Sequence, residues 1–132
     1  MAGWLIELEH RGTPVPQGRA RHCQYGVYYP PTSVAHRREL VAAFQADMLE
    51  YEDVSFPLGP PVRVRIYLAG PRVNSDLDNH AKQILDAVVD AGVLEGDDCT
   101  HIAELLIERQ LNVPKLGRYT KVEIEQLPEE LI

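Results

Sequence analysis

Residues 62–98 read VRVRIYLAGPRVNSDLDNHAKQILDAVVDAGVLEGDD, and two periodicities follow one another in this stretch. Apolar residues alternate with polar ones over residues 62–69, which predicts a half-buried strand with a basic outer face. Apolar residues then recur at helical spacing over residues 78–91, and Gly92 follows as a stop signal. A strand followed by an amphipathic helix is therefore expected here. The residues expected on the outer face of the strand are Arg63, Arg65, Tyr67 and Ala69.

Three other segments show regular patterns. Residues 4–8, WLIEL, predict a short edge strand, and residues 119–127 alternate in the manner of a strand. Residues 34–49 carry an apolar stripe at helical spacing, with Ser33 as the expected N-cap. Helices and strands of this number suggest a small sheet covered by helices.

Two segments are harder to assign. Residues 102–111 alternate like a strand, although a helix is also compatible with them. Residues 10–33 form a long connection rich in Pro and Gly, and connections of this length are often functional. The fold class expected is α+β, with a small mixed β-sheet of about four strands and two main helices in one domain over residues 1–132.

Charge is unevenly distributed along the 132 residues, whose formal net charge is −7. Residues 1–40 hold five Arg against three Glu, whereas residues 41–132 hold eight Lys or Arg against seventeen Asp or Glu. This asymmetry suggests a basic segment attached to an acidic body. The acidic total, taken alone, favours nothing more than a solvated surface.

Several classes of protein are disfavoured by the sequence. No run approaches the ~20 apolar residues of a membrane span, and the N-terminus lacks the pattern of a signal peptide. Cys23 and Cys99 are far apart and have no CxxC partner, so a disulfide framework or zinc knuckle is not indicated. We expect a cytoplasmic protein without membrane association or an organic cofactor.

An acidic cluster lies at the expected junction between strand and helix. Asp76 and Asp78 are two residues apart on an extended segment, so both carboxylates are expected on one side. Lys82 and Asp86 follow Asp78 at four-residue steps, on roughly one face of the helix. The junction can therefore present carboxylates and an ammonium group to one cavity.

The acidic doublet Asp97-Asp98 follows the helix in a loop, and it is expected to close the same cavity. Crowded carboxylates repel one another unless a cation lies between them. Hard oxygen ligands of this kind suit Mg²⁺. Lys82 could then neutralise charge that develops on a scissile phosphate.

Spacing alone leaves simpler explanations open. Asp78 and Lys82 make an ordinary i,i+4 helix pair. Asp76 is a natural N-cap, and Asp97-Asp98 fits a solvated turn. The sequence contains no P-loop, no dinucleotide-binding glycine motif and no zinc-binding histidine spacing.

The ordered set DLDNHAKQILDAVVDAGVLEGDD resembles the signature of the RusA-like Holliday junction resolvases, which are small metal-dependent endodeoxyribonucleases. The family pattern is D-x-D-N-x-x-K-x-x-x-D-A, followed by Gly and an acidic doublet, and each of its elements is present here. The upstream segments PVPQGRARH and GVYYPPTSVAHRREL resemble the family's basic N-terminal segment and first helix. The resemblance covers residues 5–125.

The resemblance implies a role for each element of the acidic set. Asp76, Asp78 and one member of the doublet would ligate Mg²⁺, with Mn²⁺ as a possible substitute. Of the doublet, Asp98 is favoured as the ligand over Asp97. Lys82 would be the catalytic cation.

Supporting groups and a partner are also implied. Asn79 is expected to orient a neighbouring carboxylate, and Asp86 to support the helix or the metal ligands. The family acts as a homodimer, and a two-fold dimer places one site on each of the two equivalent strands of a four-way junction.

Arg19, Arg21 and His22 lie in the part of the long connection that resembles the family's basic segment, and they are the first candidates for contacts with DNA. Lys82 is expected to contact the same substrate. Further candidates are Arg37, Arg38, Arg63, Arg65 and Arg72. Three tyrosines of the connection could stack on exposed bases, although packing or turn formation is their more ordinary role; they are Tyr25, Tyr28 and Tyr29.

The resulting hypothesis is a Mg²⁺-dependent, structure-selective endodeoxyribonuclease of DNA recombination and repair. It would resolve four-way junctions by paired symmetric nicks, and the resemblance implies 5′-phosphate and 3′-hydroxyl ends. Three alternatives stay open: a nuclease for other branched DNA, a junction-binding module without nuclease activity, and an acidic protein-interaction domain.

Overall fold

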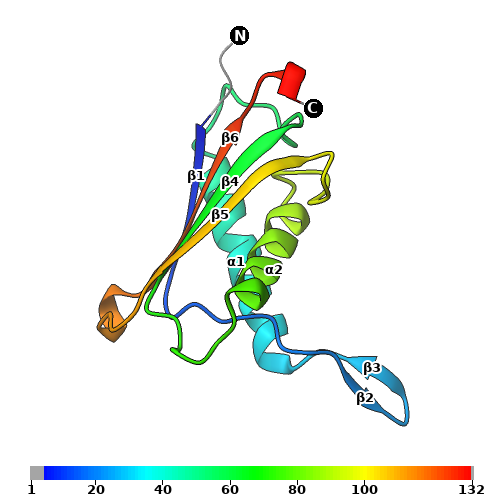
Figure 1. Cartoon of the computed structure of the whole chain (residues 1–132), viewed down its shortest axis with the longest axis vertical. Coiled ribbons are helices and arrows are strands. Elements are labelled where there is room, and N and C mark those ends of the chain that lie inside the picture. The colour runs from blue at the N-terminus through cyan, green and yellow to red at the C-terminus, as the bar shows by residue number, and fades with distance from the viewer. Residues whose placement is uncertain (1–4, 132) are drawn as a thin grey trace.

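A computed structural model describes residues 5–131 of the chain. The main sheet has four strands: β1 (Leu5–Arg11), β4 (Val62–Ala69), β5 (Ile102–Gln110) and β6 (Tyr119–Gln126). Helices α1 (Pro31–Met48) and α2 (Leu77–Asp90) lie on one face of that sheet (Figure 1). The shorter elements are β2 (Arg21–Cys23), β3 (Gly26–Tyr28) and two 3₁₀ turns, η1 (Lys115–Gly117) and η2 (Glu129–Leu131).

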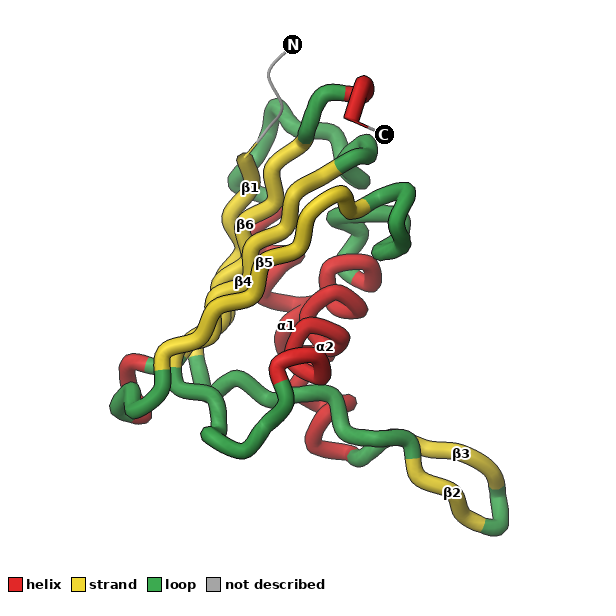
Figure 2. The backbone as a smooth tube through the Cα atoms, in the orientation of Figure 1, coloured by secondary structure: helices red, strands yellow, loops and turns green. Residues whose placement is uncertain are grey.

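The strands of the main sheet lie in the order β1-β6-β4-β5. β4 pairs parallel with β5, whereas β4 and β1 both pair antiparallel with β6. The sheet is therefore mixed, and within residues 5–131 no helix covers its other face (Figure 2). The predicted α+β class, with four strands and two main helices, is confirmed.

The alternation of β4 is confirmed at its expected boundaries. Its apolar residues Val62, Val64, Ile66 and Leu68 are all buried under the helices. The basic outer face is only partly confirmed, because the guanidinium of Arg63 contacts carboxylates of Glu104 on β5 and Glu125 on β6. Ala69, expected on the outer face, is buried. The outer face of β4 therefore carries less uncompensated positive charge than its sequence suggests.

Helix α2 buries the side that the periodicity predicts. Its buried residues include Ala81, Ile84, Leu85 and Val88. Gly92 follows the helix with a φ of +89°, the left-handed conformation that glycine adopts without steric cost. The helix therefore ends for the expected reason.

Helix α1 begins earlier than predicted. Pro30 holds the N-cap position and Pro31 the first helical position, where a missing N–H costs nothing and a fixed φ favours the helix. Ser33 is not the N-cap: it is buried inside the first turn, and its hydroxyl donates to the carbonyl of Pro30 at 3.0 Å. Leu40 and Phe44 anchor the helix in the core.

The N-terminal third differs most from expectation. β1 continues to Arg11, which pairs with Tyr119, and Trp4 lies outside the described residues. Further along the chain, β5 is a strand, as its alternation indicates.

The long connection contains the hairpin β2–β3, which projects from the body, and we call residues 19–29 the arm (Figure 2). Cys23 in the arm and Cys99 are both exposed and unbonded.

Each of the two helices carries one buried histidine. His36 on α1 is 6% exposed and its ring stacks edge-on against His10, with 5.2 Å between ring centroids. His80 on α2 is 1% exposed, and its Nε2 lies 2.8 Å from the hydroxyl of Ser75. Burial lowers the pKa of each to about 4, and neighbouring histidines add to the effect. Both rings are therefore neutral at physiological pH.

Stability should fall as the pH drops from 6.5 toward 4. The unfolded histidines take up protons near their ordinary pKa while the folded ones stay neutral, so unfolding binds up to two protons in this window. Each contributes a slope of about 1.4 kcal/mol per pH unit to the free energy of unfolding. Urea denaturation at about pH 7 and pH 5 measures how much the free energy of unfolding changes between the two pH values. In His80→Gln the slope should be about half as steep; an unchanged slope would contradict the assignment.

Candidate active site

Asp76 and Asp78 lie where the loop after β4 enters α2. The hydroxyl of Ser75 donates to the carbonyl of Arg72 at 2.6 Å and also contacts the buried ring of His80. These bonds tie the loop to the first turn of the helix. They fix the backbone that carries the two aspartates.

Asp76 holds the N-cap position, with φ −84° and ψ 133°, but its side chain makes no capping hydrogen bond. Asp78 lies in the first turn, where its Oδ1 accepts a hydrogen bond from the backbone N–H of Asn79 at 3.0 Å. Both aspartates are exposed. The positive end of the helix dipole favours negative charge at these positions. Two solvent-accessible carboxylates therefore share the start of α2.

The hydrogen bonds found for Asn79 come from its backbone rather than from its side chain. Besides the bond to Asp78, its carbonyl accepts the backbone N–H of Gln17 at 3.1 Å. Gln17 belongs to the long connection, so this bond attaches the base of the arm to the candidate site. Its side-chain Oε1 is buried without a partner among the described residues. Nothing in the sequence pattern singles out Gln17.

An ion cluster joins the exposed side of α2 to α1. Lys82 Nζ lies 3.3 Å from Asp86 Oδ1, and Arg37 Nη2 lies 3.3 Å from Asp86 Oδ2. Arg37 Nε also donates to Gln83 Oε1 at 3.2 Å, and Gln83 Nε2 donates to the carbonyl of Ser33 at 2.6 Å. Asp86 therefore contacts two basic side chains at once, Lys82 on its own helix and Arg37 on α1.

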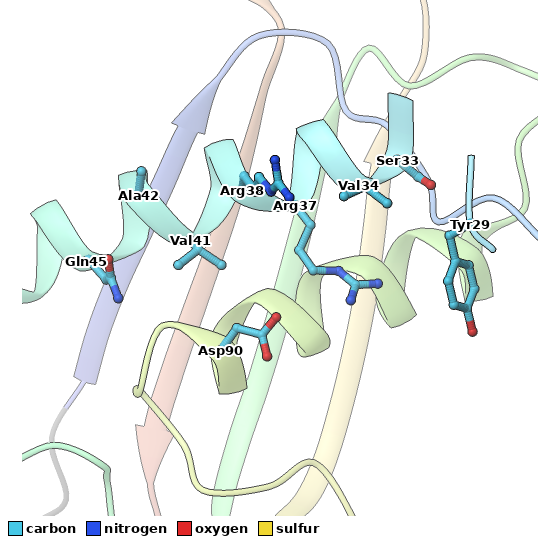
Figure 3. Close-up of a pocket in the computed structure, with 9 residues that line it drawn as sticks. All are labelled: Tyr29, Ser33, Val34, Arg37, Arg38, Val41, Ala42, Gln45 and Asp90. Carbon is cyan, nitrogen blue, oxygen red and sulfur yellow. The ribbon is translucent and has the colours of Figure 1, made fainter. Parts of the chain in front are cut away.

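A groove of about 500 Å³ lies beside this cluster, between α1 and α2. Figure 3 shows Arg37 extending from α1 toward α2, with Tyr29 at one end of the lining, Gln45 at the other, and Asp90 on the α2 side. The remaining lining comes from α1 and mixes apolar with polar side chains: Ser33, Val34, Arg38, Val41, Ala42 and Gln45. Neither aspartate at the start of α2 lines the groove, so the acidic motif occupies an open surface.

Asp97 and Asp98 lie at the opposite end of α2. They precede β5 in a loop whose end is hydrogen-bonded to Val62, the first residue of β4, whereas Asp76 and Asp78 follow the end of β4 (Figure 1). The helix has 14 residues, a rise of about 21 Å. A single chain therefore does not bring the doublet to Asp76 and Asp78.

The carboxylate of Asp98 is held by its own loop. The hydroxyl of Thr100 donates to Asp98 Oδ1 at 2.6 Å, and His101 Nδ1 lies 2.8 Å from the same oxygen. These bonds, with Thr100 contributing most, lower the pKa of Asp98 to about 2. Each of these bonds ends on Oδ1, and none of them uses Oδ2.

The donors suit a divalent metal ion in type, but one chain does not gather them. The four carboxylates named by the motif, Asp76, Asp78, Asp97 and Asp98, are exposed and offer the hard oxygens that Mg²⁺ prefers. Across residues 5–131, however, no three His, Cys, Asp or Glu side chains are grouped closely enough to hold a metal ion. The ligand set is chemically appropriate and spatially divided.

The basic candidates occupy different surroundings. Arg19, Arg21 and His22 are all exposed on the arm, and Arg72 is exposed in the loop before Asp76. Arg37 is instead engaged with Asp86 and Gln83. Arg38 and Arg65 are exposed, whereas Arg63 is paired with carboxylates in the sheet. The arm and the loop that carries Arg72 therefore hold exposed basic side chains, whereas Arg37 and Arg63 are paired with carboxylates.

No described helix combines the length and the apolar character that crossing a membrane requires. A search of curated proteins finds no match to the chain. A family model described as endodeoxyribonuclease RusA matches residues 11–125, a span that includes the arm, both ends of α2 and the acidic doublet. The family is one of Holliday junction-resolving endonucleases, and it implies a divalent metal cofactor in general. With most of its length matched, the chain belongs to the RusA family of endodeoxyribonucleases.

Proposed function

We propose that this protein is a Mg²⁺-dependent, structure-selective endodeoxyribonuclease that resolves four-way DNA junctions by paired symmetric nicks. The observation that carries the proposal is the start of α2 in a chain of this family. Asp76 and Asp78 are exposed there, and the Asp76 side chain makes no capping hydrogen bond. Lys82 follows one turn later. Exposed carboxylates beside an ammonium group suit the hydrolysis of a phosphodiester.

The roles of the residues follow from their chemistry. Asp76 and Asp78 would hold the divalent cation, Mg²⁺ or Mn²⁺ in its place, and the bound cation would supply Lewis-acid chemistry for phosphodiester hydrolysis. Lys82 balances the negative charge that develops on the scissile phosphate. Asp86 is a positioning residue, because its contact with Lys82 Nζ at 3.3 Å restrains a long and mobile side chain.

The position of Asp98 supports a homodimer with shared active sites. A two-fold axis that crosses α2 near its middle reverses the direction of the second α2, and it brings the partner subunit's Asp98 toward Asp76 and Asp78. The edge strand β5 adds exposed apolar surface, since Leu105 and Leu106 are 46% and 49% exposed. Two copies then form two equal sites, one for each strand that must be cut.

The variant Asp78→Asn should fold normally and lose cleavage of a labelled four-way junction in Mg²⁺ by roughly 100-fold or more, since a metal contributes several kcal/mol. Asp53→Asn, an exposed carboxylate in the connection between α1 and β4, is the matched control and should cut at full rate. Gel assays on junction, flap and plain duplex, with Mg²⁺ or chelator, measure this. Full activity in Asp78→Asn would refute the site, and equal cutting of flaps would favour a general branched-DNA nuclease.

A mixed-dimer experiment tests the shared site. Asp78→Asn and Asp98→Asn chains are each expected to be inactive alone. Refolded together, they form heterodimers in which one of the two shared sites has both defects and the other has none, so single nicks should reappear. A mixture of Asp76→Asn with Asp78→Asn is the control and should stay inactive, since both changes affect the same side of each site. If the first mixture is also inactive, the site lies within one chain.

Asp86→Asn should destabilise the fold more than Lys82→Met does. Asp86 is 22% exposed and loses contacts with two cations, which we expect to cost about 1 kcal/mol. Lys82 is 59% exposed, and its i,i+4 pair is worth at most about 0.5 kcal/mol. Urea denaturation of the two variants gives the comparison; equal losses would show that Arg37 does not depend on Asp86.

A further inference from the structure

The arm is an exposed hairpin that meets the body near its base, where Tyr29 lines the groove beside α1. Every residue from 19 to 29 is exposed, and the hairpin extends beyond the helices and the sheet (Figures 1 and 2). A two-stranded hairpin is marginally stable in water by itself. A surface of this kind is therefore suited to a bound partner.

Aromatic side chains occupy the tip and one strand of the arm. Tyr25 is 89% exposed in the turn, which closes through the pairing of Cys23 with Gly26 at a φ of +122°. Tyr28 is 46% exposed and lies opposite Arg21 in the hairpin. The arm thus presents flat rings beside guanidinium groups, the combination that binds unpaired bases and their phosphates.

The charge of this region points to a polyanion. Residues 10–38 contain no Asp or Glu, although the chain carries 20 of them, and the same stretch holds five Arg. Arg19 and Arg21 lie within the arm itself. A nucleic-acid backbone, with one negative charge on every phosphate, is the polyanion that such a segment fits.

The base of the arm is fixed close to the acidic motif. Gln17 donates its backbone N–H to the carbonyl of Asn79 in the first turn of α2. The two chain segments that enter and leave the arm meet where Gly18 faces Pro30. A Cβ at position 18 would lie 2.5 Å from the proline ring. The direction in which the arm leaves the body is therefore set by tight packing beside Asp78.

We propose that the arm recognises the branch point of DNA, with Tyr25 and Tyr28 stacking on base faces exposed there and Arg19 and Arg21 contacting the flanking phosphates. The inference rests on the proposed function and deepens it, because it assigns selectivity for branched DNA to residues outside the acidic motif. Plain duplex offers phosphates to the arginines but no free base faces to the tyrosines. The tyrosines therefore discriminate between substrates, whereas the arginines add affinity for any DNA.

The test compares binding of a four-way junction and of plain duplex, in the Asp78→Asn background so that the junction stays intact. Tyr25→Ala/Tyr28→Ala should weaken junction binding by roughly 10-fold or more, since stacking on each base is substantial, and should change duplex binding little. Tyr25→Phe/Tyr28→Phe should keep the preference. Arg21→Ala should weaken binding to both DNAs. Leu116→Ala, at a 97% exposed apolar residue of η1, is the control and should match the parent.

A fluorescent 2-aminopurine at the branch point gives a second readout. Its emission should be quenched by the parent and by the Phe variant, but not by the Ala variant. The arm proposal is overturned if the Ala variant keeps both the junction preference and the quenching while the proposed function stands. It is also overturned if light scattering shows that the Ala variant becomes monomeric, since the tyrosines would then be subunit contacts. A parent that binds neither DNA overturns both proposals.

Discussion

The parallel pairing of β4 with β5 is the constraint on which the rest of the structure depends. Two adjacent parallel strands need a connection that returns along the whole sheet, and α2 is that connection. The loops at its two ends must therefore lie at opposite ends of the molecule. Asp78 is at one end and Asp98 at the other for this topological reason. A local rearrangement of side chains cannot bring them together in one chain.

Acidic and basic side chains are distributed unevenly between the body of the molecule and the arm. The acidic residues lie in the body, and on its sheet face they are partly balanced by Arg63 and Lys121. Between the helices, Asp86 balances Lys82 and Arg37. The arm holds basic groups without acidic neighbours. A net charge of −7 is thus compatible with a DNA-binding region, because the relevant charge is local.

Sequence reasoning succeeded where one periodic pattern decides one element. The alternation in β4 and the stop at Gly92 each follow from a local rule. It failed where the deciding partner is distant or where two local rules compete. Ser33 is not the N-cap because α1 begins earlier, with Pro30 at the N-cap and Pro31, whose fixed φ suits a helix, at the first helical position. The acid partners of Arg63 come from strands 41 and 62 residues further along the chain, so its outer-face position was predictable and its pairing was not.

The site itself shows the same division. The motif identifies the residue types at both ends of α2, but periodicity does not say whether the strands beside a helix are parallel, and so the distance between Asp78 and Asp98 was not predictable. The hairpin in the long connection was missed because each of its strands has only three residues, too few to show alternation. Membership of the RusA family, by contrast, follows from the ordered motif and is confirmed by the family match over residues 11–125.

The hydrogen bond between the main chains of Gln17 and Asn79 has a mechanical consequence. The base of the arm is hydrogen-bonded to the first turn of α2, and Gly18 packs closely against Pro30 beside this bond. The base of the arm and the first turn of α2 are therefore joined main chain to main chain, and a displacement of either segment would shift the other.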